Sequence, residues 1–160
     1  MQDNVLTVVE ASSVRRWMGV IMLGGLGGLV IYVALVAPPK LGWQVFLIIV
    51  GALSLWMAEK MRRATEYRIE LTETELRSSD GQILALVSEI QSVDRGVFAF
   101  KPSNGFIVRT NAPQSRVWRP GLWWRMGRRI GVGGVTSAGQ TKAMSEVLSA
   151  LLAQRDQVAE

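Results

Sequence analysis

The chain has 160 residues, a length that suits one domain with a small addition. It contains no cysteine and no histidine, which excludes disulfides, thiolate nucleophiles, imidazole bases and zinc sites built from those ligands. The formal net charge is +5, and the whole excess lies from Lys60 onward, where 15 Lys and Arg accompany 10 Asp and Glu. Such a surface attracts phosphates and anionic headgroups without distinguishing between them.

Two long apolar segments come early in the chain. Residues 17–37 form 21 positions without a charged side chain, and residues 41–58 form 18 positions with Gln44 and Ser54 as the polar side chains. A helix rises about 1.5 Å per residue, so each segment approaches the roughly 30 Å of the hydrocarbon core. Two prolines between the segments indicate a tight turn. The sequence therefore predicts a transmembrane helical hairpin over residues 17–63, basic flank included, and not a cleaved signal peptide.

Basic side chains flank the two predicted spans on one side. Arg15 and Arg16 precede the first span, a basic run at residues 60–63 follows the second, and Lys40 is the basic residue of the connecting loop. Positive charges favour the cytoplasmic side of a membrane. We therefore expect a multi-pass protein with both termini in the cytoplasm. Residues 1–16 would form a cytoplasmic N-terminal segment and residues 64–160 a cytoplasmic domain.

The first span carries a cluster of four glycines: Gly24, Gly25, Gly27 and Gly28. Gly24 and Gly28 have the small-xxx-small spacing that lets another helix approach closely, and close packing is a main attraction between helices in lipid. Two partners are open at this point. The cluster packs either on the second span of the same chain or on a helix of another membrane protein.

Beyond the basic run the apolar period changes to that of strands. In residues 67–71 Tyr, Ile and Leu alternate with charged residues, as in a half-buried strand. Asp80-Gly81 and Asn104-Gly105 are turn pairs. The further predicted strands are 83–87, 88–93, 97–100, 106–108, 116–118 and 122–124, with one more around Ile130 and Val132.

The last predicted element is a helix. Ser137 and Gln140 have capping-box spacing, and the residues behind them repeat at three and four. The repeating apolar residues are Ala143, Met144, Val147, Leu148, Leu151 and Leu152. We expect this stripe to cover the open end of a strongly bent antiparallel sheet. The predicted fold class is an α+β membrane protein.

This order of elements resembles the bacterial pleckstrin-homology-like (PH-like) membrane proteins over residues 17–154. The positions that match the loose motifs of that family are Tyr67, Ile69, Thr72, Gly81, Ile90 and Val93. Val87 stands near the place where the family often has a tryptophan. The resemblance implies a split antiparallel β-barrel capped by a C-terminal helix, in the bacterial inner membrane, with a binding or accessory role and no catalysis. Some relatives with this layout act as assembly factors for photosynthetic or respiratory membrane complexes.

The sequence gives weak signals for enzyme chemistry. Gly134–Thr141 has the outline of a phosphate loop, but Gln140 replaces the lysine that would reach the outer phosphates. Glu70, Glu73 and Glu75 are interpreted as solvated carboxylates and not as a paired acid and base. We therefore expect no enzyme, with no catalytic, cofactor-binding or metal-binding residues.

The stretch RPGLWWRMGRRIGVGG, residues 119–134, is the main candidate for binding. The predicted partner or lipid contacts are Arg116, Arg119, Trp123, Trp124, Arg125, Arg128 and Arg129. Arginine and tryptophan can bind nucleic acid, anionic headgroups or a protein partner, and the arginines can also be simply solvated. We expect membrane lipids or a larger integral membrane complex as partner, and no nucleic acid. One of the two adjacent tryptophans should be buried and the other exposed, because strand side chains alternate. Neutralising Arg125, Arg128 and Arg129 should leave folding nearly intact.

Two functions follow from these observations. The first is an accessory or assembly subunit of a larger inner-membrane complex, docking through the glycine face and the basic domain. The alternative is a stand-alone protein that binds lipid headgroups or maintains the envelope.

Overall fold

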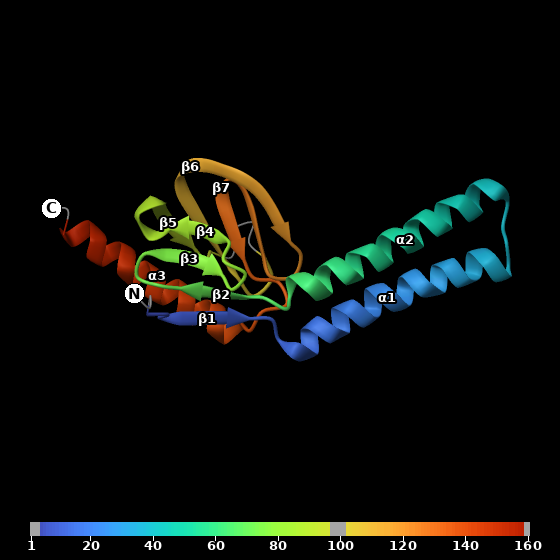
Figure 1. Ribbon diagram of the computed structural model, residues 1–160, viewed down its shortest axis with the longest axis horizontal. Helices are drawn as coiled ribbons and strands as arrows, with labels where there is room; N and C mark the ends of the chain where they lie inside the picture. Colours follow the sequence, from blue (N-terminus) through green and yellow to red (C-terminus); the bar gives the residue numbers. More distant parts are fainter. Residues whose placement is uncertain (1–3, 97–101, 159–160) are drawn as a thin grey trace. The chain divides into compact units, whose positions relative to one another are not determined.

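Residues 4–96 and 102–158 are described by the computed structural model, in which the chain divides into two units (Figure 1). One unit is Ser13–Arg63. The other combines the segment that ends at Ser12 with the chain from Ala64 onward. The first unit is called the hairpin and the second the β-domain.

The hairpin consists of two helices, α1 (Ser13–Val36) and α2 (Leu41–Ala64). Each is long and apolar enough to cross a membrane, and only 11% of the most apolar stretch of each is buried. Large apolar side chains such as Ile21, Leu29 and Phe46 are exposed along both helices. A surface of this kind suits lipid as its solvent. The predicted pair of long apolar helices is confirmed: α1 begins before its predicted start and ends at Val36, and α2 begins at its predicted start and continues past its predicted end.

Side chains of each helix bond the main chain of the other near both ends of the hairpin. The Gln44 amide donates to the carbonyl oxygen of Ala34 at 3.0 Å, near the connecting loop. At the other end the Arg16 guanidinium donates to the carbonyl oxygen of Arg62 at 3.3 Å. The last carbonyls of a helix lack partners within the helix, so these side chains supply hydrogen bonds that the helix itself does not.

The β-domain contains two antiparallel sheets. The first has the order β1-β2-β3-β4 and the second the order β5-β6-β7. The strands are β1 (Thr7–Glu10), β2 (Arg68–Leu71), β3 (Glu75–Ser78), β4 (Ile83–Leu86), β5 (Ile90–Asp94), β6 (Phe106–Arg119) and β7 (Trp123–Val132). A short 3-10 turn, η1 (Val87–Glu89), joins the sheets. The predicted strands at 106–108 and 116–118 belong to one continuous β6, and the predicted strand at 97–100 lies outside the described residues.

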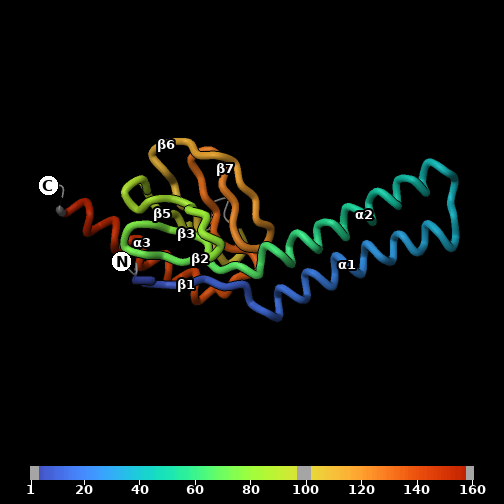
Figure 2. Tube along the Cα trace, viewed as in Figure 1, coloured from blue at the N-terminus to red at the C-terminus, as the bar shows by residue number. Residues whose placement is uncertain are grey.

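Strand β1 precedes the hairpin in the chain, yet it belongs to the β-domain. It pairs antiparallel with β2, with Val9 opposite Ile69, and Figure 2 shows the N-terminal strand alongside β2. Val9 is fully buried in the core. From the sequence, residues 1–16 are an N-terminal segment, and no pattern in them predicts this strand. The hairpin is therefore inserted into the β1–β2 connection of one domain.

The C-terminal helix α3 (Ala138–Val158) packs on this domain and contacts β1 and β5. Met144, Leu148 and Leu152 of the predicted stripe are buried, whereas Ala143 is exposed. Gln140 does not close a capping box. Its side-chain oxygen instead accepts a hydrogen bond from the amide of Glu10 at 3.0 Å, which ties the first turn of α3 to β1.

The two sheets pack together around one apolar core, but they are not closed into a barrel. Ile69, Leu84, Phe106 and Ile130, from strands of both sheets, are fully buried in this core, which α3 completes. The expected α+β order is confirmed, whereas closure of the strands into a barrel is not. Because the edge of β4 is not paired with another strand in the described sheets, its outer main-chain groups must find other partners.

Candidate functional site

The basic and aromatic stretch lies on the β6–β7 hairpin. Gly121, in the turn, has φ +84°, a left-handed conformation that favours glycine. The pairing register shifts on both sides of Gln114, which pairs with Gly127, and Gly127 has φ +59°. These irregularities are β-bulges, which bend a strand and change the face to which later side chains point.

The two adjacent tryptophans point to opposite faces of β7. Trp123 is 1% exposed and forms part of the core. Trp124 is half-buried, and its indole lies over Gly131 at the position that a Cβ would occupy. The prediction that one of the two is buried is confirmed for Trp123, whereas Trp124 is half-buried and not exposed as expected. Trp123 is therefore a core residue with no surface for a partner.

Arg125 is buried, contrary to the expectation that it joins Arg128 and Arg129 on a contact surface. Its side chain is 8% exposed and lies over the Trp123 ring. The guanidinium donates to the carbonyl oxygens of Ile83 and Leu84, each at 3.0 Å, and to that of Ser115 at 2.8 Å. Burial lowers the pKa of the guanidinium from its ordinary value. Arg125 thus supplies hydrogen-bond donors to the unpaired edge of β4. In a closed barrel, the main-chain amides of a neighbouring strand would be the donors at this edge.

Arg119 also joins the two sheets. It donates to Asp80 at 2.9 Å and to Gln82 at 3.4 Å, both in the turn between β3 and β4. Its guanidinium carbon lies 5.6 Å from the centre of the Tyr67 ring, within cation–π range. Arg119 and Arg125 therefore act as ties between the sheets and are not available as free cations.

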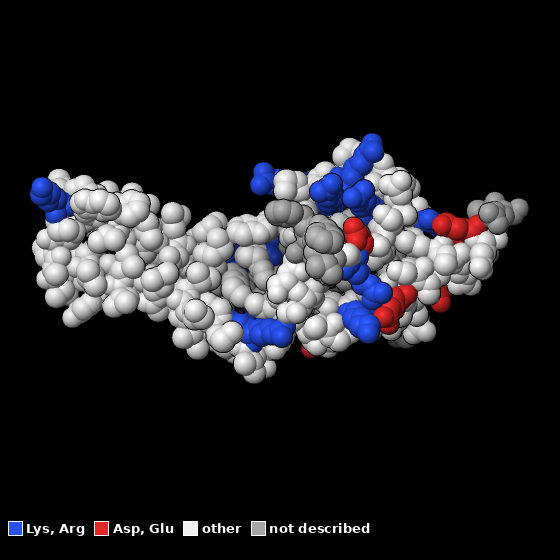
Figure 3. Space-filling model, turned by 180° about the vertical axis from the view of Figure 1, so that it is seen from behind, with Lys and Arg blue, Asp and Glu red and all other residues white. Residues whose placement is uncertain are grey.

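The exposed arginines of the stretch are Arg116, Arg128 and Arg129, joined by Arg109. Within residues 4–96 and 102–158, none of the four pairs with a carboxylate. Arg109 and Arg129 are direct cross-strand partners, an arrangement of like charges that destabilises a sheet. Figure 3 shows Lys and Arg side chains gathered over β6 and β7, whereas the basic side chains of the α1–α2 hairpin in that view lie near its ends and its middle is uncharged.

A hollow of about 350 Å³ lies on the β6–β7 hairpin. Arg116, Trp118, Trp124 and Met126 contribute to its lining. Trp118 pairs with Trp124 across the strands, and Trp118 and Met126 are 48% and 54% exposed. Trp118, Met126 and Arg109 are not among the predicted contact residues. Strand alternation could have found two of them, because Trp118 lies two residues from Arg116 and Met126 two residues from Trp124, and residues two apart share a face.

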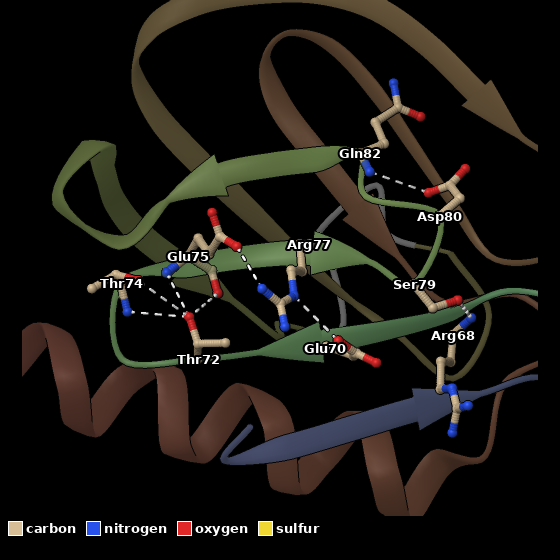
Figure 4. Close-up of polar contacts among 9 residues, drawn as sticks. All are labelled: Arg68, Glu70, Thr72, Thr74, Glu75, Arg77, Ser79, Asp80 and Gln82. Atoms are coloured by element: carbon tan, nitrogen blue, oxygen red, sulfur yellow. Dashed lines mark hydrogen bonds and ion pairs between the residues drawn. The ribbon is translucent and has the colours of Figure 1, made fainter. Parts of the chain in front are cut away.

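The acidic cluster on β2 and β3 is bound to an arginine. Arg77 donates to Glu70 at 3.2 Å and to Glu75 at 3.0 Å, as Figure 4 shows. The bond to Glu75, and then the bond to Glu70, raise the pKa of the Arg77 guanidinium. Glu70 and Glu75 are therefore ion-paired, not simply solvated as expected, and Glu73 is exposed. Beside them the Thr72 hydroxyl oxygen accepts hydrogen bonds from the main-chain amides of Thr74 and Glu75, which closes the β2–β3 turn.

The main chain of the glycine-rich segment before α3 packs directly on the main chain of two other turns. The amides of Gly133, Gly134 and Val135 donate to the carbonyl oxygens of Leu122, Ser103 and Gly121. A Cβ on Gly134 would come within 2.7 Å of the Gly121 carbonyl oxygen. These amides are therefore used within the fold, whereas a phosphate loop needs its amides free.

A second, larger hollow of about 570 Å³ lies between the β2–β3 turn, η1 and α3. Its basic residue, Arg155, donates to the carbonyl oxygens of Val87 and Ile90 at 3.1 and 2.8 Å. Arg155 thus ties α3 to the junction of the two sheets. In the described part of the chain, no group of three or more acidic side chains is placed to hold a metal ion.

The glycines of α1 separate into two groups. Gly27 is buried against α2, where a Cβ would come within 2.8 Å of the Gly51 carbonyl oxygen and 3.0 Å of Leu55. By contrast, a Cβ on Gly24, Gly25 or Gly28 would meet no atom within 4 Å. Gly27 therefore serves the contact within the hairpin, and the space beside Gly24 and Gly28 is open.

In comparisons with known proteins, no family model, no curated protein and no solved structure matches this chain.

Proposed function

We propose that this protein is a non-enzymatic accessory subunit of a larger membrane complex in the bacterial inner membrane. In this proposal the hairpin spans the membrane, and the β-domain is a PH-like domain on the cytoplasmic side. The resemblance described above makes photosynthetic and respiratory complexes the first candidates for the partner.

The distribution of the glycines carries the proposal. The contact between α1 and α2 uses Gly27, so the hairpin itself gives no reason for Gly24, Gly25 and Gly28. Each glycine in a helix costs about 1 kcal/mol relative to alanine. A partner helix that packs closely on Gly24 and Gly28 would offset this cost.

The pairing of strands in the β-domain supports placing both ends of the hairpin on the same side of the membrane. Strand β1 precedes α1, β2 follows α2, and the two strands pair directly. If the hairpin spans a membrane, both of its ends must then lie on one side. The basic residues at 15–16 and 60–63 favour the cytoplasm as that side.

The PH-like assignment is supported by the order of the elements. Sheets of four and three antiparallel strands are followed by a C-terminal helix that covers their core. Arg119 and Arg125 hold the second sheet to the first at the open edge. We propose no catalysis for two reasons. Glu70 and Glu75 are ion-paired with Arg77, and the main-chain amides of the glycine-rich segment already donate to carbonyl oxygens of the fold.

The test is purification of the full chain from native membranes in mild detergent, followed by a native gel and mass identification. We expect a stoichiometric large partner. Changing Gly24 and Gly28 together to leucine should reduce its recovery by at least about tenfold, the effect of roughly 1.4 kcal/mol. The matched control is Gly42→Leu, which adds the same side chain at another open glycine of the hairpin.

Two results would contradict the proposal. The first is a wild-type chain that migrates without a partner, which would favour the alternative of a stand-alone protein that binds lipid headgroups or maintains the envelope. The second is equal recovery of the partner with the double variant and with Gly42→Leu, which would remove the glycine face from the contact.

A further inference from the structure

The outer face of the β6–β7 hairpin combines exposed apolar side chains with unpaired cations. Trp118 and Met126 are about half exposed and lie with Arg116 and Trp124 around the hollow described above. Large apolar side chains at such exposure on a β-domain surface have a cost in water, which contact with a partner removes.

The charges around this face point to an anionic partner. Arg116, Arg128 and Arg129 are exposed, and no carboxylate of the described chain pairs with them. Arg109 and Arg129 lie directly opposite each other, and no carboxylate of the described residues forms an ion pair with either of them. An anionic surface would relieve the repulsion between these like charges and attract all of these arginines together.

We infer that this face docks on the anionic phospholipid surface of the membrane that holds the hairpin. Tryptophan prefers the boundary between headgroups and acyl chains, and methionine is a flexible apolar side chain that fits irregular surfaces. Arginine binds phosphate through several donors at once. Trp118 and Met126 enter the boundary, and Arg116, Arg128 and Arg129 bind the phosphates around them. A nucleic-acid partner fits less well, because Trp124 is engaged over Gly131 and leaves Trp118 to stack alone, whereas single-strand binding uses successive aromatic side chains.

This inference rests on the proposed function only in placing the hairpin in a membrane. It assigns the basic face to lipid and leaves the glycine face for a protein partner. The two surfaces can therefore fail independently.

The experiment uses the full chain in nanodiscs, with a spin label on a single introduced cysteine. The natural chain has no cysteine, so each variant carries one label. The label replaces Met126 in one variant and Ala150, an exposed residue of α3, in the matched control. Relaxation by dissolved oxygen and by a water-soluble nickel chelate distinguishes lipid contact from aqueous exposure. The discs contain phosphatidylcholine alone or phosphatidylcholine mixed with phosphatidylglycerol.

We expect the label at Met126 to report lipid contact in the discs that contain phosphatidylglycerol, and aqueous exposure in phosphatidylcholine alone. The label at Ala150 stays aqueous in both. Neutralising Arg116, Arg128 and Arg129 to glutamine should reduce the ratio of docked to free domain by about fivefold for each arginine, and by roughly a hundredfold together. Raising the salt to about 1 M, where the Debye length is about 3 Å, should have a similar effect.

Three results would overturn the inference. A label at Met126 that stays aqueous in every disc shows that the face does not dock. Equal lipid contact with and without phosphatidylglycerol removes the role of the arginines. A label that is aqueous in lipid discs but becomes buried in the complex purified from native membranes shows a protein contact instead. None of these results changes the recovery of a partner through Gly24 and Gly28.

Discussion

Two parts of the β6–β7 hairpin use the same residue types for opposite purposes. Trp123 and Arg125 point inward, where the indole is part of the core and the guanidinium bonds three main-chain carbonyls. Trp118 and Arg128 are exposed and make no such bonds. The difference shows that pairing register and bulges, not residue type, decide whether an arginine here stabilises the fold or is free to bind.

The glycine cluster of α1 divides in the same way. Gly27 lies against the backbone of α2, whereas Gly24 and Gly28 are open. One helical turn has 3.6 residues, so neighbours in such a cluster must face different directions. In both regions, residues of one type that lie close together in the sequence divide between the interior and the surface.

The largest test of the comparison is the replacement of each tryptophan by alanine. Trp123→Ala should lower the free energy of unfolding of the β-domain by about 3–5 kcal/mol, because it leaves a large cavity in the core. Trp118→Ala should change it by no more than about 0.5 kcal/mol, because that side chain is exposed. Fluorescence-detected unfolding of the full chain in detergent measures both, with circular dichroism to follow secondary structure. Similar losses for the two variants would show that the comparison is wrong.

The next test replaces the inner and outer arginines in turn. Arg125→Met keeps much of the side-chain volume but removes the donors to Ile83, Leu84 and Ser115, so we expect a loss of roughly 2–4 kcal/mol in the free energy of unfolding. Arg128→Met is the matched control and should stay within about 0.5 kcal/mol of the natural chain. The same unfolding experiment measures both. A neutral Arg125→Met would mean that water satisfies the edge of β4 equally well.

The smallest expected effect has the opposite sign. Arg109→Gln removes one of two like charges that lie directly opposite each other, and should stabilise the β-domain by about 0.2–1 kcal/mol at low salt. The gain should shrink as salt screens the pair. The control is Arg116→Gln, which has no arginine as cross-strand partner in the described register. A gain that does not depend on salt would show that charge repulsion is not its source.

The sequence by itself determined the elements whose signals are local. Charge-free length predicts α1 and α2, alternation predicts β2 and the opposed tryptophans, and a repeat of three and four predicts α3. Each of these signals depends on neighbours within a few turns of the same segment. The turn glycines Gly81 and Gly121 have positive φ, as their turns require.

Only the tertiary structure decided which members of each cluster are inside. Strand β1 has four residues and becomes recognisable only by pairing with β2, which lies beyond the hairpin in the chain. The burial of Arg125 depends on bulges near Gln114 and on the carbonyls of β4, some 40 residues away. The role of Gly27 likewise depends on Gly51 of the other helix. Contacts between segments distant in sequence set these outcomes, and the residue types at single positions do not contain that information.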